Sequence, residues 1–312
     1  MSLFVANSRL MKDVQELKMA IEQGDYRALA RGLTYVENDI PPAAELLKNL
    51  TIRSEIPVIG FTGPPGAGKS TLINALISFF TGSGKKIAVL AVDPTSPFNF
   101  GSLLGDRIRM ASQFNKPNVF NRSIATRGSL GGISAKTLEM TDLLRAADFD
   151  LVFVETVGVG QSEVEIAGLA DKTVVVLVPE SGDEIQHIKS GLMEIAGAFV
   201  VNKADREGAS SFANNLKKLM RQQHEDTPVF MTVADKDEGI TALARWLTKP
   251  ESENANSLRR SYLLAEKAFK IIQHKRMASL DKTALMKAIE NAGVSPSFNI
   301  YRFADEWTDK RG

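Results

Sequence analysis

The stretch Gly63-Pro64-Pro65-Gly66-Ala67-Gly68-Lys69-Ser70 matches the pattern GxxxxGK[ST] at every fixed position. An apolar run at residues 56–61 precedes it, and the apolar sequence TLINALISFF follows it from Thr71. This order is typical of a buried strand that leads through a phosphate-binding loop (P-loop) into a helix. The glycines allow successive backbone N–H groups to turn toward phosphate oxygens at the positive end of that helix. We therefore predict that residues 63–71 bind nucleotide phosphates, with Lys69 on the β- and γ-phosphates and Ser70 on Mg²⁺.

Six further apolar runs along the chain have the length and composition of buried strands. Several are rich in valine and isoleucine without polar alternation, which is typical of strands covered on both faces. Helical patterns separate them, and this alternation predicts βαβ units. We expect an α/β fold with a mostly parallel sheet flanked by helices, whose strands fall at residues 56–61, 87–92, 118–124, 151–155, 173–178, 199–202 and 228–232.

The two ends of the chain have helical patterns instead. Residues 1–50 contain two apolar stripes at helical spacing, with Gly24 placed to end the first helix and prolines at 41 and 42 to open a third. Residues 250–257 are polar and predict a linker. A further helix is expected near residues 281–291. Between the linker and that helix, apolar residues recur at alternating spacings of four and three: Leu258, Tyr262, Ala265, Phe269 and Ile272.

These patterns predict three parts: a helical N-terminal extension at residues 1–50, a nucleotide-binding domain at 51–249 and a helical C-terminal arm at 250–312. The apolar seam of the arm fits a helix folded back on the domain as well as it fits a dimerisation arm.

The charge and residue composition exclude several classes of function. The 38 basic and 37 acidic residues leave a net charge of +1, so no overall field attracts nucleic acid or an acidic membrane surface. Cysteine is absent, which excludes disulfides, thiolate zinc sites and iron–sulfur clusters. The N-terminus lacks a secretory pattern, and the apolar runs are shorter than a membrane span. We expect a soluble, cytoplasmic protein without nucleic-acid or membrane partners.

A second motif, Asn202-Lys203-Ala204-Asp205, follows the sixth apolar run and matches NKxD. A carboxylate at the last position accepts two hydrogen bonds from guanine, from the N1–H and the exocyclic amine, whereas adenine lacks that pair of donors. Together with the P-loop, the motif favours guanine. The alternative is that Asp205 only caps a helix that begins near Gly208.

Polar residues that follow the predicted strands point to a metal site beside the P-loop. Glu155 ends the fourth run, and Asp93 ends the second, with Asp106 in the loop beyond. Carboxylates at adjacent strand ends can hold a hydrated Mg²⁺ ion. Gln161 either orients the attacking water or is a surface glutamine, and Arg127 either contacts a phosphate or partner or belongs to a structural turn.

Taken together, these residues resemble the methylmalonyl-CoA mutase-associated GTPases, the MeaB/ArgK family. The resemblance spans most of the chain, in seven blocks that occur in the family order: GDYRALARGLTYVEN, GPPGAGKSTLINAL, VDPTSP with GSLLGDRIRM, TRGSLGGIS, LVFVETVGVGQSEVEIAGLAD, SGDEIQHIKSGLMEIA and VVNKAD.

The resemblance implies a homodimeric GTPase that binds GTP or GDP with Mg²⁺ and acts as a chaperone for an adenosylcobalamin-dependent acyl-CoA mutase. It implies that residues 180–190 respond to the nucleotide. By motif, it places Lys69, Asp106 and Glu155 in the catalytic site, where we also predict Gln161. It assigns Mg²⁺ to Ser70, Asp93, Asp106 and Glu155, and the base to Asn202, Lys203, Asp205, Val233 and Ala234.

The chain departs from the family pattern at a few positions. Val233 occupies the place of a serine in the loop that supports the base, His187 stands where a small residue is expected, and Pro179-Glu180-Ser181 replaces a glycine-rich start of the responsive segment. Two other functions remain open. A P-loop kinase of small molecules is disfavoured by NKxD, and a nickel or cobalt metallochaperone GTPase needs Cys and His ligands that this chain does not supply.

Overall fold

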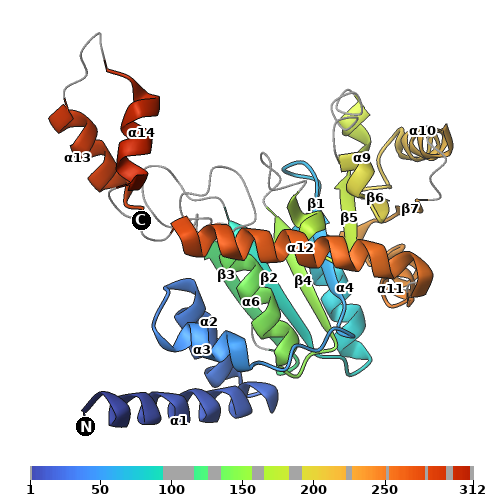
Figure 1. The fold of residues 1–312 in the computed structure, drawn as a ribbon. Coiled ribbons are helices and arrows are strands. Elements are labelled where there is room, and N and C mark those ends of the chain that lie inside the picture. The colour runs from blue at the N-terminus through green and yellow to red at the C-terminus, as the bar shows by residue number, and fades with distance from the viewer. Residues whose placement is uncertain are drawn as a thin grey trace. The chain divides into compact units, whose positions relative to one another are not determined.

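The computed structural model describes residues 2–93, 116–125, 135–156, 165–182, 192–222, 227–250, 253–277, 280–292 and 298–309. The chain divides into two compact units, Met1–Lys267 and Ala268–Gly312. Each unit is described by itself below (Figure 1).

Within the described residues of the first unit, seven strands form one parallel sheet in the order β3-β2-β4-β1-β5-β6-β7. Each strand lies within two residues of a predicted run, and the predicted parallel α/β fold is confirmed. The strands are β1 Val58–Thr62, β2 Ile87–Asp93, β3 Val119–Ala125, β4 Leu151–Thr156, β5 Lys172–Leu177, β6 Ala198–Val201 and β7 Val229–Met231.

Helices cover both faces of the sheet, which explains why its strands lack polar alternation (Figure 1). On one face, α4 (Lys69–Gly82) and α11 (Ile240–Leu247) pack on side chains such as Ile59 and Phe153. On the other face, α6 (Ala135–Ala146) packs on β2 and β4, while α9 (Leu192–Ile195) and α10 (Ala209–Gln222) pack on β5 and β6.

The N-terminal helices α1 (Ser2–Glu22), α2 (Tyr26–Glu37) and α3 (Pro42–Asn49) belong to the same core as α6. Gly24 has a φ of 85° directly after α1, and the Asp25 carboxylate then accepts the backbone N–H groups of Arg27 and Ala28 to cap α2. A Cβ atom at Gly32 would lie 3.0 Å from Ile21 and 3.1 Å from Leu143. The small residue therefore lets three helices pack closely together.

The predicted linker at residues 250–257 is wrong from residue 253 onward, because α12 runs from Glu253 to Met277. The polar residues 253–257 contain neither glycine nor proline, so the helix that carries the apolar seam extends back through them. The predicted helix near residues 281–291 is confirmed as α13 (Lys282–Ala292). In the second unit, the sequence patterns did not indicate α14 (Ile300–Asp309), where Phe303 and Trp307 stack with their ring centroids 5.8 Å apart.

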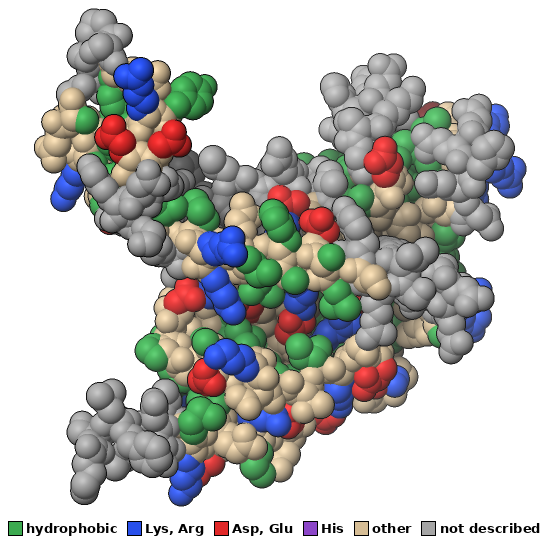
Figure 2. All heavy atoms as spheres, in the orientation of Figure 1, with side chains coloured by type: hydrophobic (Ala, Val, Ile, Leu, Met, Phe, Trp, Pro, Cys, Tyr) green, Lys and Arg blue, Asp and Glu red, His purple; other side chains and the backbone are tan. Residues whose placement is uncertain are grey.

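The described part of the chain contains no helix with the length and apolar character that a membrane span requires. Figure 2 shows acidic and basic side chains interspersed with apolar ones on the visible face, rather than a continuous field of one sign.

Lys172 is a buried cation that joins the start of β5 to the end of α11. Its ammonium donates to the carbonyl oxygens of Trp246 and Leu247, both at 3.0 Å, and to that of Lys249. The last carbonyls of a helix have no partner within the helix, so Lys172 supplies the missing donors. It also lies 5.1 Å from the centre of the Trp246 ring.

The substitution Lys172→Met is expected to lower the free energy of unfolding by about 2–3 kcal/mol, because it leaves buried carbonyl oxygens without a charged donor. Urea unfolding would measure the change. Lys217→Met, on the exposed face of α10, is the matched control. Equal midpoints for the two variants would show that the bonds at Lys172 contribute no net stability.

Candidate nucleotide-binding site

The P-loop connects β1 to α4 at the carboxyl edge of the sheet, where the sequence places it. Gly63 has a φ of 132°, and a Cβ atom there would lie 2.1 Å from the carbonyl oxygen of Val176. Gly68 has a φ of 87°, and a Cβ atom there would lie 2.4 Å from the side-chain nitrogen of Asn202. Both positions therefore need glycine for the backbone conformation and for the close approach of neighbouring strands and loops.

Lys69 is the first residue of α4 and is only 7% exposed. Its ammonium donates to the carbonyl oxygens of Gly63 at 2.7 Å and Pro64 at 3.0 Å. The cation is thus held inside the curve of the loop, close to the N–H groups that begin the helix. This combination of a fixed positive charge and a helix N-terminus favours phosphate groups.

Ser70 and Glu155 lie together beside the loop. The Ser70 hydroxyl donates to the Glu155 carboxylate with 2.6 Å between the oxygens. Glu155 reaches this place because β4 pairs with β1 in a register that puts it opposite Phe61, near the end of β1. A hydroxyl that donates its proton to a carboxylate keeps its lone pairs available, so the pair fits an ion that prefers oxygen ligands.

The structure describes less of the other predicted metal residues. Asp93 ends β2, and β2 pairs with β4 so that Val92 lies opposite Thr156, which brings the Asp93 backbone to the same edge of the sheet. Asp106 and Gln161 lie outside the described residues, as do Arg127 and His187, and their roles stay predictions. In the described part of the chain, His, Cys, Asp and Glu side chains form no cluster of three or more that could hold a metal ion.

Asn202 is a buried side chain that joins three segments of the site. Its amide nitrogen donates to the carbonyl oxygen of Ala67 in the P-loop at 3.0 Å. Its amide oxygen accepts the Thr232 hydroxyl at 3.1 Å and the Ala234 N–H at 3.2 Å. The first residue of NKxD therefore holds the loop after β7, which includes Val233 and Ala234, against the phosphate loop.

Lys203 and Asp205 continue the motif toward the surface. Lys203 has a φ of 54° and donates from its ammonium to the carbonyl oxygen of Gly66 at 2.8 Å. The Asp205 carboxylate is 43% exposed and pairs with the ammonium of Lys236 at 2.9 Å. The helix that follows, α10, begins at Ala209, near the predicted position, and the side-chain contact described for Asp205 is with Lys236 rather than with the N–H groups of that helix.

The segment after β5 is tied to the same region. Glu180 lies in the short helix η3 (Pro179–Gly182) and pairs with Arg206, which directly follows Asp205. Arg206 lowers the pKa of the Glu180 carboxyl through this contact. Residues 183–190, the rest of the segment predicted to respond to the nucleotide, lie outside the described residues.

Sequence reasoning missed Lys236, because no motif separates it from an ordinary surface lysine. It lies in the short helix η4 (Ala234–Lys236), and its hydrogen bond is the main cause that holds the pKa of the Asp205 carboxyl below its ordinary value of 3.8. Only the folded structure shows that Lys236 contacts Asp205, because the two residues are 31 positions apart in the chain.

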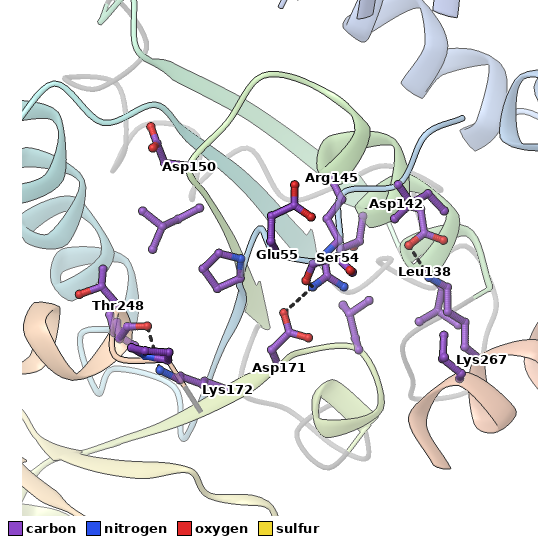
Figure 3. A pocket seen from close by; sticks show the side chains of 18 of the residues that line it. Ser54, Glu55, Leu138, Asp142, Arg145, Asp150, Asp171, Lys172, Thr248 and Lys267 are labelled. Carbon is purple, nitrogen blue, oxygen red and sulfur yellow. Dashed lines mark hydrogen bonds and ion pairs between the residues drawn. The ribbon is translucent and has the colours of Figure 1, made fainter. Parts of the chain in front are cut away.

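A cavity of about 750 Å³ lies at the opposite edge of the sheet, where β1, β4 and β5 begin. Figure 3 shows Arg145 and Asp171 in contact on its lining, with 2.7 Å between the guanidinium nitrogen and the carboxylate oxygen. Lys85 pairs with Asp150 at 2.7 Å, and Lys267 of α12 pairs with Asp142 of α6. Because these charges neutralise one another, we interpret the cavity walls as structural ion pairs rather than as a ligand site.

Most of the chain is similar in sequence to known proteins. The model of the family described as methylmalonyl-CoA mutase-associated GTPase MeaB matches residues 29–288. A putative GTPase of Pyrococcus horikoshii is 45% identical over 265 residues, which cover 82% of each chain. GTPase ArgK of Escherichia coli is 40% identical over 199 residues, covering 62% of this chain and 60% of the relative.

Two further similarities extend over most of this chain. The mouse protein named methylmalonic aciduria type A homolog, mitochondrial, is 34% identical over 269 residues, covering 77% of this chain and 63% of its own length. The crystal structure of an LAO/AO transport system kinase superposes with a TM-score of 0.64 at 24% identity, covering 95% of this chain and 97% of that one. At this identity the superposition supports the fold alone.

Proposed function

Since the chain belongs to the family of methylmalonyl-CoA mutase-associated GTPases, we propose that it couples GTP hydrolysis to the protection and cofactor loading of an adenosylcobalamin-dependent acyl-CoA mutase. That the protein is a P-loop GTPase follows from the family match, from relatives named GTPases and from the fold. The specific partner, methylmalonyl-CoA mutase or a related acyl-CoA mutase, belongs to the proposal. So do the cobalamin role and the homodimer.

The observation that supports nucleotide binding is the set of hydrogen bonds that Asn202 makes to Ala67, Thr232 and Ala234. These bonds hold the P-loop, the NKxD loop and the loop after β7 together. We infer that a nucleotide whose phosphates bind at residues 63–71 has its base beside the Asp205 carboxylate. That carboxylate selects guanine through the N1–H and the exocyclic amine, a pair of donors that adenine does not present.

On the phosphate side, we assign Lys69 to the β- and γ-phosphates and the Ser70–Glu155 pair to Mg²⁺. The hydroxyl and carboxylate oxygens fit the ligand preference of this ion, which binds through few protein groups and keeps several waters. When bound, Mg²⁺ neutralises charge that develops on the phosphate oxygens. Asp93 and Asp106 complete the proposed set of carboxylates, and Gln161 is proposed to orient the attacking water.

Contacts of Glu180 support a path from nucleotide to partner. Through Arg206 it ties the start of the proposed responsive segment, residues 180–190, to the neighbour of Asp205. A rearrangement of Asp205 around the base would therefore be transmitted to this segment through Arg206 and Glu180.

In the C-terminal part of α12, Phe269 is 63% exposed and Ile272 is 52% exposed, and both belong to the predicted seam. These exposed apolar residues support residues 250–312 as a dimerisation arm.

The test is GTP turnover by the purified protein with and without an adenosylcobalamin-dependent acyl-CoA mutase from the same source. We expect a large, saturable stimulation, because phosphoryl transfer that lacks an activating group loses about 10³–10⁵ in rate. Radiolabelled γ-phosphate should appear only as inorganic phosphate, which separates the GTPase from a kinase. Unchanged turnover without complex formation would contradict the chaperone proposal and leave the GTPase assignment in place.

A further inference from the structure

Asp205 and Lys236 lie on neighbouring loops at the proposed base side of the nucleotide site. The Lys236 ammonium donates to Oδ2 of Asp205 at 2.9 Å. The side chains are 43% and 54% exposed, respectively, so neither is fixed by burial. An exposed aspartate on a loop rotates freely about its side-chain bonds unless a specific contact restrains it. The orientation of this carboxylate therefore depends on its partners.

The loop that carries Lys236 is held firmly in place. The backbones of Val233 and Glu238 bond to each other in both directions, at 3.1 and 3.2 Å. Gly239, with a φ of 76°, closes the loop, and a Cβ atom there would lie 2.1 Å from the carbonyl oxygen of Met231. Asn202 then fixes the Ala234 N–H from the other side. Lys236 thus extends toward Asp205 from a backbone that is itself restrained at several points.

Other groups around Asp205 are engaged elsewhere or have no suitable atoms. Val233 and Ala234, the loop residues nearest to Lys236 in the proposed base site, have apolar side chains that are 4% and 5% exposed. The ammonium of Lys203 donates to Gly66, and the guanidinium of Arg206 pairs with Glu180. Lys236 is therefore the cation whose described hydrogen bond fixes the Asp205 carboxylate.

We propose that Lys236 is a positioning residue for guanine recognition, which holds the Asp205 carboxylate in the orientation that the base requires. An ionised carboxylate has about four lone-pair sites, so a bond from Lys236 to Oδ2 still leaves acceptors for the N1–H and the amine of guanine. The proposal rests on the proposed contact of Asp205 with guanine. It explains how a base loop with valine at position 233, which provides no side-chain donor, still orients that carboxylate.

The experiment compares Lys236→Met and Lys236→Arg in the full-length protein, with Lys217→Met on α10 as the matched control. The dissociation constants of GDP and of inosine diphosphate are measured together with kcat and KM for GTP. Inosine diphosphate keeps the N1–H of guanine but lacks the exocyclic amine, so one hydrogen bond fewer depends on the carboxylate.

For Lys236→Met we expect the Kd for GDP and the KM for GTP to rise about three- to fivefold, the range of an exposed ion pair, with kcat unchanged. The Kd for inosine diphosphate should rise less, so that discrimination between the two bases falls. Lys236→Arg should restore most of the affinity, and the effect of Lys236→Met should shrink at high salt because the pair is exposed. A merely structural role would change both nucleotides equally.

The variant Asp205→Ala separates this proposal from the one on which it rests. If Asp205→Ala leaves GDP affinity unchanged, the assignment of guanine to Asp205 is wrong. If Asp205→Ala weakens GDP binding while Lys236→Met leaves it unchanged or tightens it, only the role of Lys236 is wrong. In the Asp205→Ala background, Lys236→Met should have no further effect on GDP affinity.

Discussion

Replacement of Lys69 by alanine is expected to lower kcat/KM for GTP by about 10²–10³-fold, the usual effect of removing one preorganised donor from a site where charge develops. The ammonium is nearly buried and is held by the Gly63 and Pro64 carbonyl oxygens at the start of α4. No reorganisation is needed before it meets the phosphates, so its contribution appears mainly in the transition state. Steady-state GTP hydrolysis with a phosphate assay measures the change.

Lys217→Ala, at an exposed position of α10, controls for the loss of a lysine as such. Circular dichroism and urea unfolding of Lys69→Ala test whether the loop survives without its two internal bonds. A folded Lys69→Ala variant that hydrolyses GTP at the original rate would contradict the assignment of this site to phosphoryl transfer.

The second large effect is expected from Asp205→Asn, which should weaken GDP binding about 10²-fold and favour xanthosine diphosphate instead. A carboxylate presents only acceptor atoms, whereas an amide presents an acceptor oxygen on one side and a donor NH₂ group on the other. Xanthine keeps the N1–H of guanine but replaces the amine with a carbonyl, and this pair of groups matches the amide. Competition binding with GDP, xanthosine diphosphate and ADP measures the exchange of preference.

Asp235→Asn is the matched control for this exchange. Asp235 lies beside Lys236 in η4 and is exposed, so its substitution makes the same chemical change close to the site. We expect it to leave the preference for guanine intact. If Asp205→Asn still prefers GDP to xanthosine diphosphate, another group recognises guanine.

The fold was predictable because its strongest signals are local. Buried parallel strands appear as continuous apolar runs, and the P-loop appears as glycines at fixed intervals followed by Lys69 and Ser70. The carboxyl-edge rule for parallel sheets then brings Glu155 toward Ser70 without further information, and the two side chains do meet. Short polar segments next to a helix, such as residues 253–257, carry too weak a signal to mark where α12 begins.

The finer arrangement of the site was not predictable because it depends on contacts between distant residues. The motif predicts that Asn202 belongs to the base site, but only the fold shows that its amide is bonded to Ala67, Thr232 and Ala234. The position of Lys236 against Asp205 depends on the register of β6 and β7 and on the closed loop after β7. A sequence pattern contains neither of these.

The way the N-terminal helices pack has a practical consequence for dissecting the protein. Leu29, Leu33 and Leu46 are at most 1% exposed and share one core with residues of α6 and with the sheet side chains Val152 and Val154. Deleting the first fifty residues would expose to water the apolar side chains that these helices cover, among them Leu143 of α6 and Phe120 of β3. These helices therefore form part of the hydrophobic core of the nucleotide-binding domain, and shortened forms of the protein should keep them.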